Sequence, residues 1–200
     1  MGSRRFVLAS ASPARRRLLE SAGLAPEVQP SGFDEGALSA PTPHQLAAAL
    51  AAGKARAVGA RERDALVLGC DSLLELDGVA YGKPESPGQA RERWALMAGR
   101  SGTLHTGHCL LDLRAGQPTR ELVETASTTV HFGRPDDAEI EAYIDSGEPL
   151  AVAGAFTLDG LGGWFVTGIE GDHGTVLGLS LPLLRRMLGR LGVRVTDLWA

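Results

Sequence analysis

Three short stretches of the 200-residue sequence combine residue types that handle phosphates, protons and metal ions. The first, "SASPARR", places Ser10, Ser12 and Arg15 between an expected strand and an expected helix. Backbone N–H groups at a helix start attract anions, and serine hydroxyls and a forked guanidinium can hold phosphate oxygens. The alternative is an ordinary capped helix whose arginines, including Arg16 and Arg17, are solvated. This stretch alone leaves both possibilities open.

The second stretch, "GCDSLL", places Asp71 at the expected C-terminal end of an apolar strand, the edge where α/β sheets bind ligands. A carboxylate there can bind a divalent metal or take a proton from water. The alternative is an aspartate that hydrogen-bonds to its own turn. The third, "YGKPES", holds Lys83 between Gly82 and Pro84 in a stiff turn that suits phosphate binding, whereas most lone lysines are simply solvated.

Glu35, in "GFDEG", and Lys54, in "AAGKARA", extend this set of charges. Each is a weak signal alone, but carboxylates and lysines together suit metal and phosphate chemistry. His105 and His108 form the pattern "HTGH". In a strand these two residues face opposite sides of the sheet, so we do not expect them to share a metal.

Alternating helices and strands must position these residues. An apolar strand over 6–9 leads to a helix that Ser12 caps and Gly23 ends. A long Ala-rich helix over 43–60 carries Lys54. The other expected strands are a short one over 27–30, a pair over 65–78, and long ones over 103–113 and 120–132. The other expected helices lie over 136–146 and 180–191. One further helix begins at a Ser86–Gln89 capping box and places Trp94 in the core. This mixture predicts an α/β or α+β fold built on a mixed twisted sheet.

Composition restricts the classes of protein that fit. Hydrophobic content is 44% and charged content 22%, as in ordinary globular proteins, and the formal net charge of −4 argues against binding of nucleic acid polymers. Cys70 and Cys109 are far apart and outside any C-x-x-C, so we expect neither a disulfide framework nor a zinc site. With no apolar run long enough to span a bilayer and no signal segment expected, we predict a cytoplasmic protein that does not bind membranes.

Taken in order, the motifs resemble those of the Maf family, the septum-formation-inhibitor-like nucleotide pyrophosphatases, over about residues 6–191. The matching stretches are "LASASPARRRLLE", "GKARAV", "GCDS", "DGVAYGKP", "GEPLAVAGAF" and "IEGDHGTVLGLSLPLL". Several ordered motifs in one chain are far more specific than any one of them. The resemblance therefore favours the phosphate-binding interpretation of the first stretch.

The resemblance implies one domain over residues 1–200, with two closely packed lobes around a central nucleotide-binding cleft and a fold similar to ITPase-like pyrophosphatases. It implies a homodimer that uses Mg²⁺ or Mn²⁺ and hydrolyses canonical or modified nucleoside triphosphates between the α and β phosphates, which makes it a hydrolase acting on acid anhydrides. The implied roles are proton acceptor for Asp71, metal ligands for Glu35 and Asp71, triphosphate binding for Lys54 and Lys83, and a phosphate-binding loop for Ser10, Ser12 and Arg15.

The chain departs from the family pattern where the base is selected. Members that prefer dTTP and UTP carry Arg, Thr and Gln at three positions where this chain has Ala14, Ser72 and Asp159, and members that prefer 7-methyl-GTP carry Trp, Gln and Glu. Val152 replaces a Lys often found before the "AG" of "GEPLAVAGAF". The reaction class therefore transfers better than the base preference. Two alternatives stay open: a nucleotide-binding regulator of cell division with little hydrolysis, and an unrelated phosphatase that releases orthophosphate.

Overall fold

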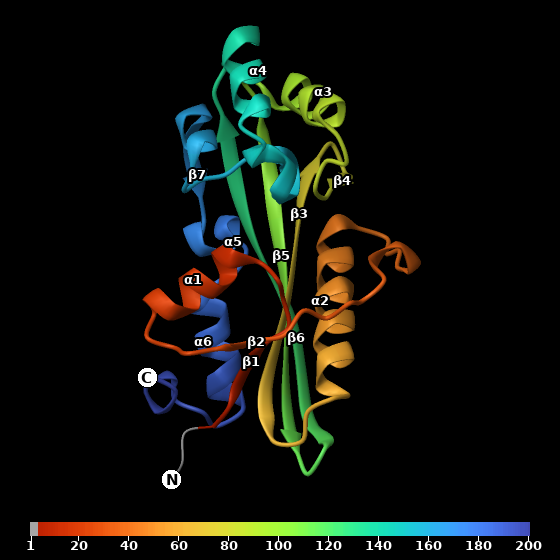
Figure 1. Ribbon diagram of the computed structural model, residues 1–200, viewed down its shortest axis with the longest axis vertical. Coiled ribbons are helices and arrows are strands. Elements are labelled where there is room, and N and C mark those ends of the chain that lie inside the picture. The colour runs from red at the N-terminus through yellow and green to blue at the C-terminus, as the bar shows by residue number, and fades with distance from the viewer. Residues whose placement is uncertain (1–3) are drawn as a thin grey trace.

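A mixed β-sheet runs through the centre of the molecule, and helices cover both of its faces (Figure 1). The computed structural model describes residues 4–200. Within them the sheet has seven strands in the order β2-β1-β3-β5-β6-β7, with β4 paired to β3. The strands are β1 Phe6–Leu8, β2 Glu27–Val28, β3 Ala65–Leu76, β4 Val79–Tyr81, β5 Ser101–Arg114, β6 Gln117–Phe132 and β7 Val166–Glu170. Strand β1 is parallel to β2 and β3, while the pairs β3–β4, β3–β5, β5–β6 and β6–β7 are antiparallel. The expected mixed α/β fold is confirmed.

Most helices begin at capping residues that the sequence displays. The helices are α1 Pro13–Ser21, α2 Pro43–Gly59, α3 Pro87–Met97, α4 Asp137–Asp145, α5 His173–Leu177 and α6 Leu181–Arg190. Short 3-10 helices are η1 Glu35–Ala37, η2 Glu148–Ala151, η3 Ala153–Ala155, η4 Leu161–Phe165 and η5 Val195–Asp197. Ser12, Thr42, Ser86 and Ser180 each accept a backbone N–H at the start of a long helix, which satisfies a donor that the helix itself leaves unpaired.

The expected capping box of α3 is only half formed. Ser86 accepts the backbone N–H of Gln89, but the Gln89 side chain accepts from Glu85 N rather than from Ser86 N. A complete box forms instead at α4, where Asp136 and Glu139 each accept the other's backbone N–H. The Glu139 carboxylate, at the third helical position of α4, accepts the N–H of its own cap residue, Asp136. The Gln89 amide instead accepts the N–H of the residue before its cap.

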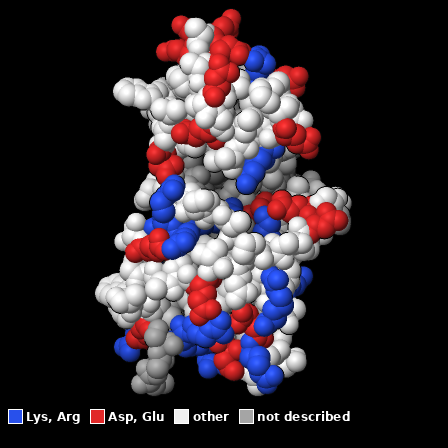
Figure 2. Space-filling model, viewed as in Figure 1, with Lys and Arg blue, Asp and Glu red and all other residues white. Residues whose placement is uncertain are grey.

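The apolar core is divided between the two ends of the sheet. At one end, leucines of β1 and β3 pack against α1 and α6 on one face, and small residues of α2 pack on the other. At the other end, α3 and α4 cover an aromatic cluster around Trp94, which is buried as expected and donates its indole N–H to Ala155 O. Figure 2 shows a hollow across the middle of this face, between the two ends. That residues 1–200 form a single domain of two lobes stays a prediction.

Strand β3 corrects one expectation from the sequence. Residues 65–78 were expected to form two strands, with Asp71 at the end of the first, yet β3 is a single strand of 12 residues with Asp71 at its centre. The strand continues because β5 pairs with it along its length, with Asp71 opposite Gly107. Leu73 and Leu74 are buried on its two faces, so both sides of the strand stay covered beyond Asp71.

Both cysteines are buried thiols. Cys70 and Cys109 are free thiols, and burial raises the pKa of each to about 12. Neither thiol is therefore ionised at neutral pH, which makes both poor nucleophiles. Among the residues described, no helix has the length and apolar character needed to cross a bilayer.

Candidate active site

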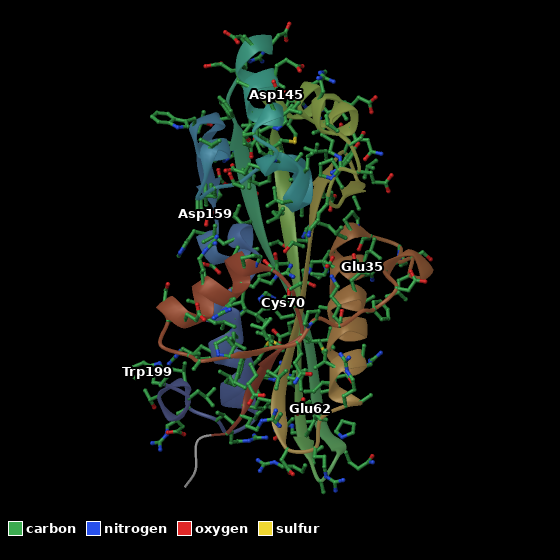
Figure 3. All side chains as sticks on the ribbon, in the orientation of Figure 1. Glu35, Glu62, Cys70, Asp145, Asp159 and Trp199 are labelled. Atoms are coloured by element: carbon green, nitrogen blue, oxygen red, sulfur yellow. The ribbon has the colours of Figure 1, made fainter. Side chains whose placement is uncertain are left out.

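Lys54 joins two carboxylates in a partly buried cluster beside α2. Its ammonium is 2.8 Å from Glu35 Oε1 and also hydrogen-bonds to Asp71 Oδ1. The Lys54 and Asp71 side chains are only 11% and 10% exposed, whereas Glu35 is 55% exposed. Three residues singled out in the sequence, from a 3-10 turn, a helix and a strand, therefore meet at one point. Figure 3 shows Glu35 beside α2 on one side of the sheet.

Two glycines allow α2 to lie close enough for this contact. Gly69 precedes Asp71 by two residues in β3, and Gly107 of β5 is the cross-strand partner of Asp71. Both glycines therefore lie on the same face of the sheet as the Asp71 side chain, the face that α2 covers. A Cβ at Gly69 would lie 2.3 Å from the Ala51 carbonyl oxygen, and one at Gly107 would lie 2.1 Å from that of Ala47. Any larger side chain would push the helix, and with it Lys54, away from Asp71.

Arg15 is the centre of a second cluster on the opposite face of β3. Its side chain is buried and donates to Ser10 Oγ at 3.0 Å, Ser72 Oγ at 3.1 Å and Gly178 O at 2.8 Å. Ser12 caps α1, and its backbone N–H donates to Ser10 Oγ at 3.2 Å. The Ser10 hydroxyl accepts both of its hydrogen bonds, and the Ser12 hydroxyl accepts the backbone N–H of Arg15. Each of these two hydroxyls therefore keeps its own hydrogen to donate to a ligand.

The sequence did not predict which groups hold Arg15 in place. Thr106 of β5 hydrogen-bonds to Ser72 at 2.8 Å and donates to Thr175 O at 2.8 Å. The Gly178 carbonyl, just before α6, accepts from Arg15. A backbone carbonyl has no signature in a sequence, and Thr106 is one of several threonines in the two long strands. Only the cross-strand register, Ser72 opposite Thr106, could have identified that partner.

The two clusters meet at a gap in the edge of the sheet. Strand β1 pairs with residues Leu66–Leu68 of β3, and β4 pairs with Leu74–Leu76. Among the residues described, no strand pairs with 69–73 on that side. Asp71 and Ser72 lie in this gap and point to opposite faces, since neighbouring side chains alternate along a strand. A ligand at the gap could therefore reach both clusters.

The remaining predicted site residues lie outside the two clusters and are half-buried or exposed. Lys83 follows β4 and is exposed, and it forms no ion pair with any residue described. Ala14 is half-buried on α1. Asp159 is 48% exposed and lies 3.9 Å from Arg17 of α1, on the side of the sheet opposite Glu35 (Figure 3). Arg17 is thus paired at the helix surface, and Arg16 pairs with Glu20.

Glu148 holds the loop that carries Asp159. Its carboxylate accepts from Thr157 Oγ1 and from the backbone N–H groups of Leu161 and Gly162. Burial acts to raise the pKa of Glu148, but these hydrogen bonds outweigh it and the net pKa is lowered. The "GEP" motif is therefore structural here, and it fixes the loop next to α1.

The two histidines of "HTGH" act separately, as expected. His105 hydrogen-bonds to Ser127 and Glu75 on one face of the sheet. His108 donates from Nδ1 to Thr106 O and accepts from Ser180 N at Nε2 on the other. They share no ligand position, and both connect neighbouring elements.

The two carboxylates of the first cluster have the donor chemistry that a divalent cation requires. Glu35 and Asp71 converge on the Lys54 ammonium, and carboxylate oxygens are the donors that Mg²⁺ and Mn²⁺ prefer. Within residues 4–200, no group of three or more His, Cys, Asp or Glu side chains could hold a metal ion alone. Mg²⁺ commonly uses one or two carboxylates and takes its other ligands from substrate phosphates and water, so two carboxylates are sufficient.

The protein is thus of the mixed α/β class, with a site at which acidic and basic side chains meet at the gap in the sheet edge. Residues 5–191 match the profile of a family described as Maf-like protein. A nucleoside triphosphate pyrophosphatase of Streptomyces coelicolor is 60% identical over 199 residues, which cover 98% of this chain and 95% of the relative. One of Nocardia farcinica is 55% identical over 203 residues, or 97% and 96% of the two chains. The chain therefore belongs to the Maf-like protein family, and the resemblance noted in the sequence is confirmed.

Proposed function

We propose that the protein hydrolyses a nucleoside triphosphate between the α and β phosphates and releases a nucleoside monophosphate and pyrophosphate. The observation that carries this proposal is the Glu35–Lys54–Asp71 cluster at the gap in the sheet edge. Relatives more than 50% identical over almost the whole chain bear the name nucleoside triphosphate pyrophosphatase. An enzyme that cleaves this bond is a hydrolase acting on acid anhydrides.

The reaction that we propose needs a proton acceptor and several positive charges. Asp71 accepts a proton from the attacking water, whose oxygen bonds to the α phosphorus as the bond to the α–β bridging oxygen breaks. The pyrophosphate that leaves carries the electron pair of that bond. Lys54 orients the Asp71 carboxylate and, with Lys83, offsets the charge of the triphosphate oxygens.

We assign the first cluster to the metal and the second to the phosphates. Glu35 and Asp71 would hold a divalent cation, which supplies further positive charge against the triphosphate. Ser10 and Ser12 bind phosphate oxygens through their hydroxyl hydrogens, and Arg15 keeps two of its five N–H donors for the same purpose. Membership of the family supports a homodimer and a cytoplasmic location as parts of the same proposal.

A nucleotide panel with two product readouts tests the reaction. The purified protein is incubated with canonical and modified nucleoside triphosphates and Mg²⁺ or Mn²⁺, and pyrophosphate and orthophosphate are measured separately. Metal-dependent release of pyrophosphate with equimolar monophosphate is expected. Orthophosphate as the first product would indicate an ordinary phosphatase, and tight binding without either product would indicate a regulator.

We propose that Asp159 contributes to the choice of base. An ionised carboxylate only accepts hydrogen bonds, so it favours a base that presents an exocyclic amine, whereas glutamine both donates and accepts. Its position 3.9 Å from Arg17 of α1, the helix that also carries Arg15, supports this role. The test compares the order of preference for purine and pyrimidine triphosphates in the wild type and in Asp159→Gln. An unchanged order would exclude Asp159 from base selection.

A further inference from the structure

Helix α2 contains one glycine in its Ala-rich middle, directly before Lys54. Glycine is a much poorer helix former than alanine, so its presence at position 53 needs a physical reason. Gly53 has ordinary helical backbone geometry, so the reason is one of space rather than of conformation. A Cβ at Gly53 would lie 2.5 Å from Cζ of Phe33 and less than 3 Å from two further ring atoms. The missing side chain therefore makes room for the Phe33 ring.

Phe33 begins the loop that carries Glu35. The ring is half-buried and packs with Leu38 against the apolar side of α2. Asp34 then accepts the backbone N–H of Gly36 at 3.1 Å and starts the 3-10 turn that contains Glu35. The loop is thus tied to two successive residues of α2, by an apolar contact at Gly53 and by an ion pair at Lys54.

The apolar contact holds the loop in a way that water does not screen. Glu35 is more than half exposed, and water weakens ion pairs at exposed side chains. The contact of the half-buried Phe33 ring is not weakened in this way, because its contribution follows the apolar area removed from water. The placement of Glu35 on Lys54 therefore depends on the ring two residues earlier.

We propose that the seat of Phe33 on Gly53 is a positioning contact that holds Glu35 at the metal site and so sets the affinity for the divalent cation in the triphosphate complex. The proposal rests on the function proposed above, because it assigns Glu35 to the metal. Phe33 touches neither substrate nor cation and acts only through Glu35.

Gly53→Ala is the direct test, because its effect on the helix and its effect on the loop have opposite signs. Alanine is the better helix former, and this gain offsets the loss of ring burial, so thermal stability should change little while the new methyl group displaces the ring. We expect amide hydrogen exchange of residues 33–37 to accelerate at least tenfold. We expect Mn²⁺ affinity, measured by electron paramagnetic resonance with an α,β-methylene triphosphate analogue, to fall at least fivefold. The Phe33→Ala variant should show the same two changes.

Gly189→Ala is the matched control. Gly189 lies in α6, and a Cβ there would have no neighbour within 4 Å, so alanine brings the same helix preference without a steric contact. It should leave loop exchange and Mn²⁺ affinity at wild-type values. Phe33→Leu combined with Gly53→Ala should recover part of the Mn²⁺ affinity, since the smaller side chain leaves room for the methyl group.

The outcomes separate this inference from the proposed function. The positioning role of Phe33 would be overturned if the Gly53→Ala variant kept both amide hydrogen exchange of residues 33–37 and Mn²⁺ affinity within twofold of the wild type. A wild-type protein that binds no Mn²⁺ with the analogue would overturn it as well. A wild-type protein that binds Mn²⁺ and the analogue but releases no pyrophosphate from any nucleotide would refute the proposed function alone, because neither readout requires turnover.

Discussion

His108 of β5 is a buried, neutral link between the sheet and the start of α6. Its Nδ1 hydrogen is donated to Thr106 O at 2.9 Å, and its Nε2 accepts the backbone N–H of Ser180 at 2.9 Å. Protonation would remove that acceptor. Burial, and secondarily the positive charge of Arg15, lowers the pKa of His108 from 6.5 to about 4. His108 thus supports the segment that also presents Gly178 to Arg15.

The lowered pKa makes stability depend on acid in a defined window. Between pH 6.5 and about 4, the unfolded chain binds a proton at His108 that the folded protein does not bind. The free energy of unfolding therefore falls as the pH decreases through 6.5, and the loss is complete only below about 4. The contribution of this one residue amounts to about 2 kcal/mol between pH 7 and pH 5.

The perturbation is His108→Gln, whose amide can donate to Thr106 O and accept from Ser180 N without titrating. Urea unfolding of both proteins, followed by far-UV circular dichroism from pH 7 to pH 5, measures the difference. The wild type should lose about 2 kcal/mol more than the variant over this range. Subtraction cancels the other titrating groups. Parallel pH profiles for the two proteins would refute the assignment of a buried neutral His108.

Two further changes test the packing around the site. Gly107→Ala places a methyl group 2.1 Å from the Ala47 carbonyl and should lower the free energy of unfolding by about 1–3 kcal/mol, as measured in urea, with pyrophosphate release reduced because Lys54 moves from Asp71. Arg15→Lys loses the forked contacts to Ser10, Ser72 and Gly178 and should cost about 2 kcal/mol in the same assay. Stability equal to that of the wild type in either variant would contradict the corresponding contacts.

The sequence was a good guide to the helices because their first turns carry local signals. A Ser cap followed by Pro marks the starts of α1 and α3, and the structure has both starts where these caps predicted them. Helix α2 begins at Pro43 as expected, and the structure adds Thr42 as its cap. Such caps work through hydrogen bonds within four residues, so their signal can be read from the local sequence. The capping boxes show where such local signals fail. The box expected at Gln89 is incomplete, and a complete box forms at Glu139, because closing a box depends on the reach of the individual side chain.

The strands and the arrangement of the site depend on partners that a sequence does not reveal. "CDS" is polar at its centre and resembles the end of a strand, yet β5 pairs straight past it. The sequence supplied the residue types of the acid–lysine cluster, and the structure joins Glu35, Lys54 and Asp71. The sequence did not show that Arg15 and Ser72 lie on the face of the sheet opposite to Asp71, or that Phe33 packs against Gly53. Both facts depend on how α1 and α2 are placed against the sheet.

The proposed reaction requires Asp71 as the proton acceptor for hydrolysis between the α and β phosphates. Its most direct test is the rate of pyrophosphate release by Asp71→Asn and by the wild type with the best nucleotide and saturating Mg²⁺. Removal of a general base predicts a fall in kcat of about 10²–10⁴-fold with the fold intact by circular dichroism. Pyrophosphate release within a few-fold of the wild-type rate in a folded Asp71→Asn protein would exclude Asp71 as the proton acceptor.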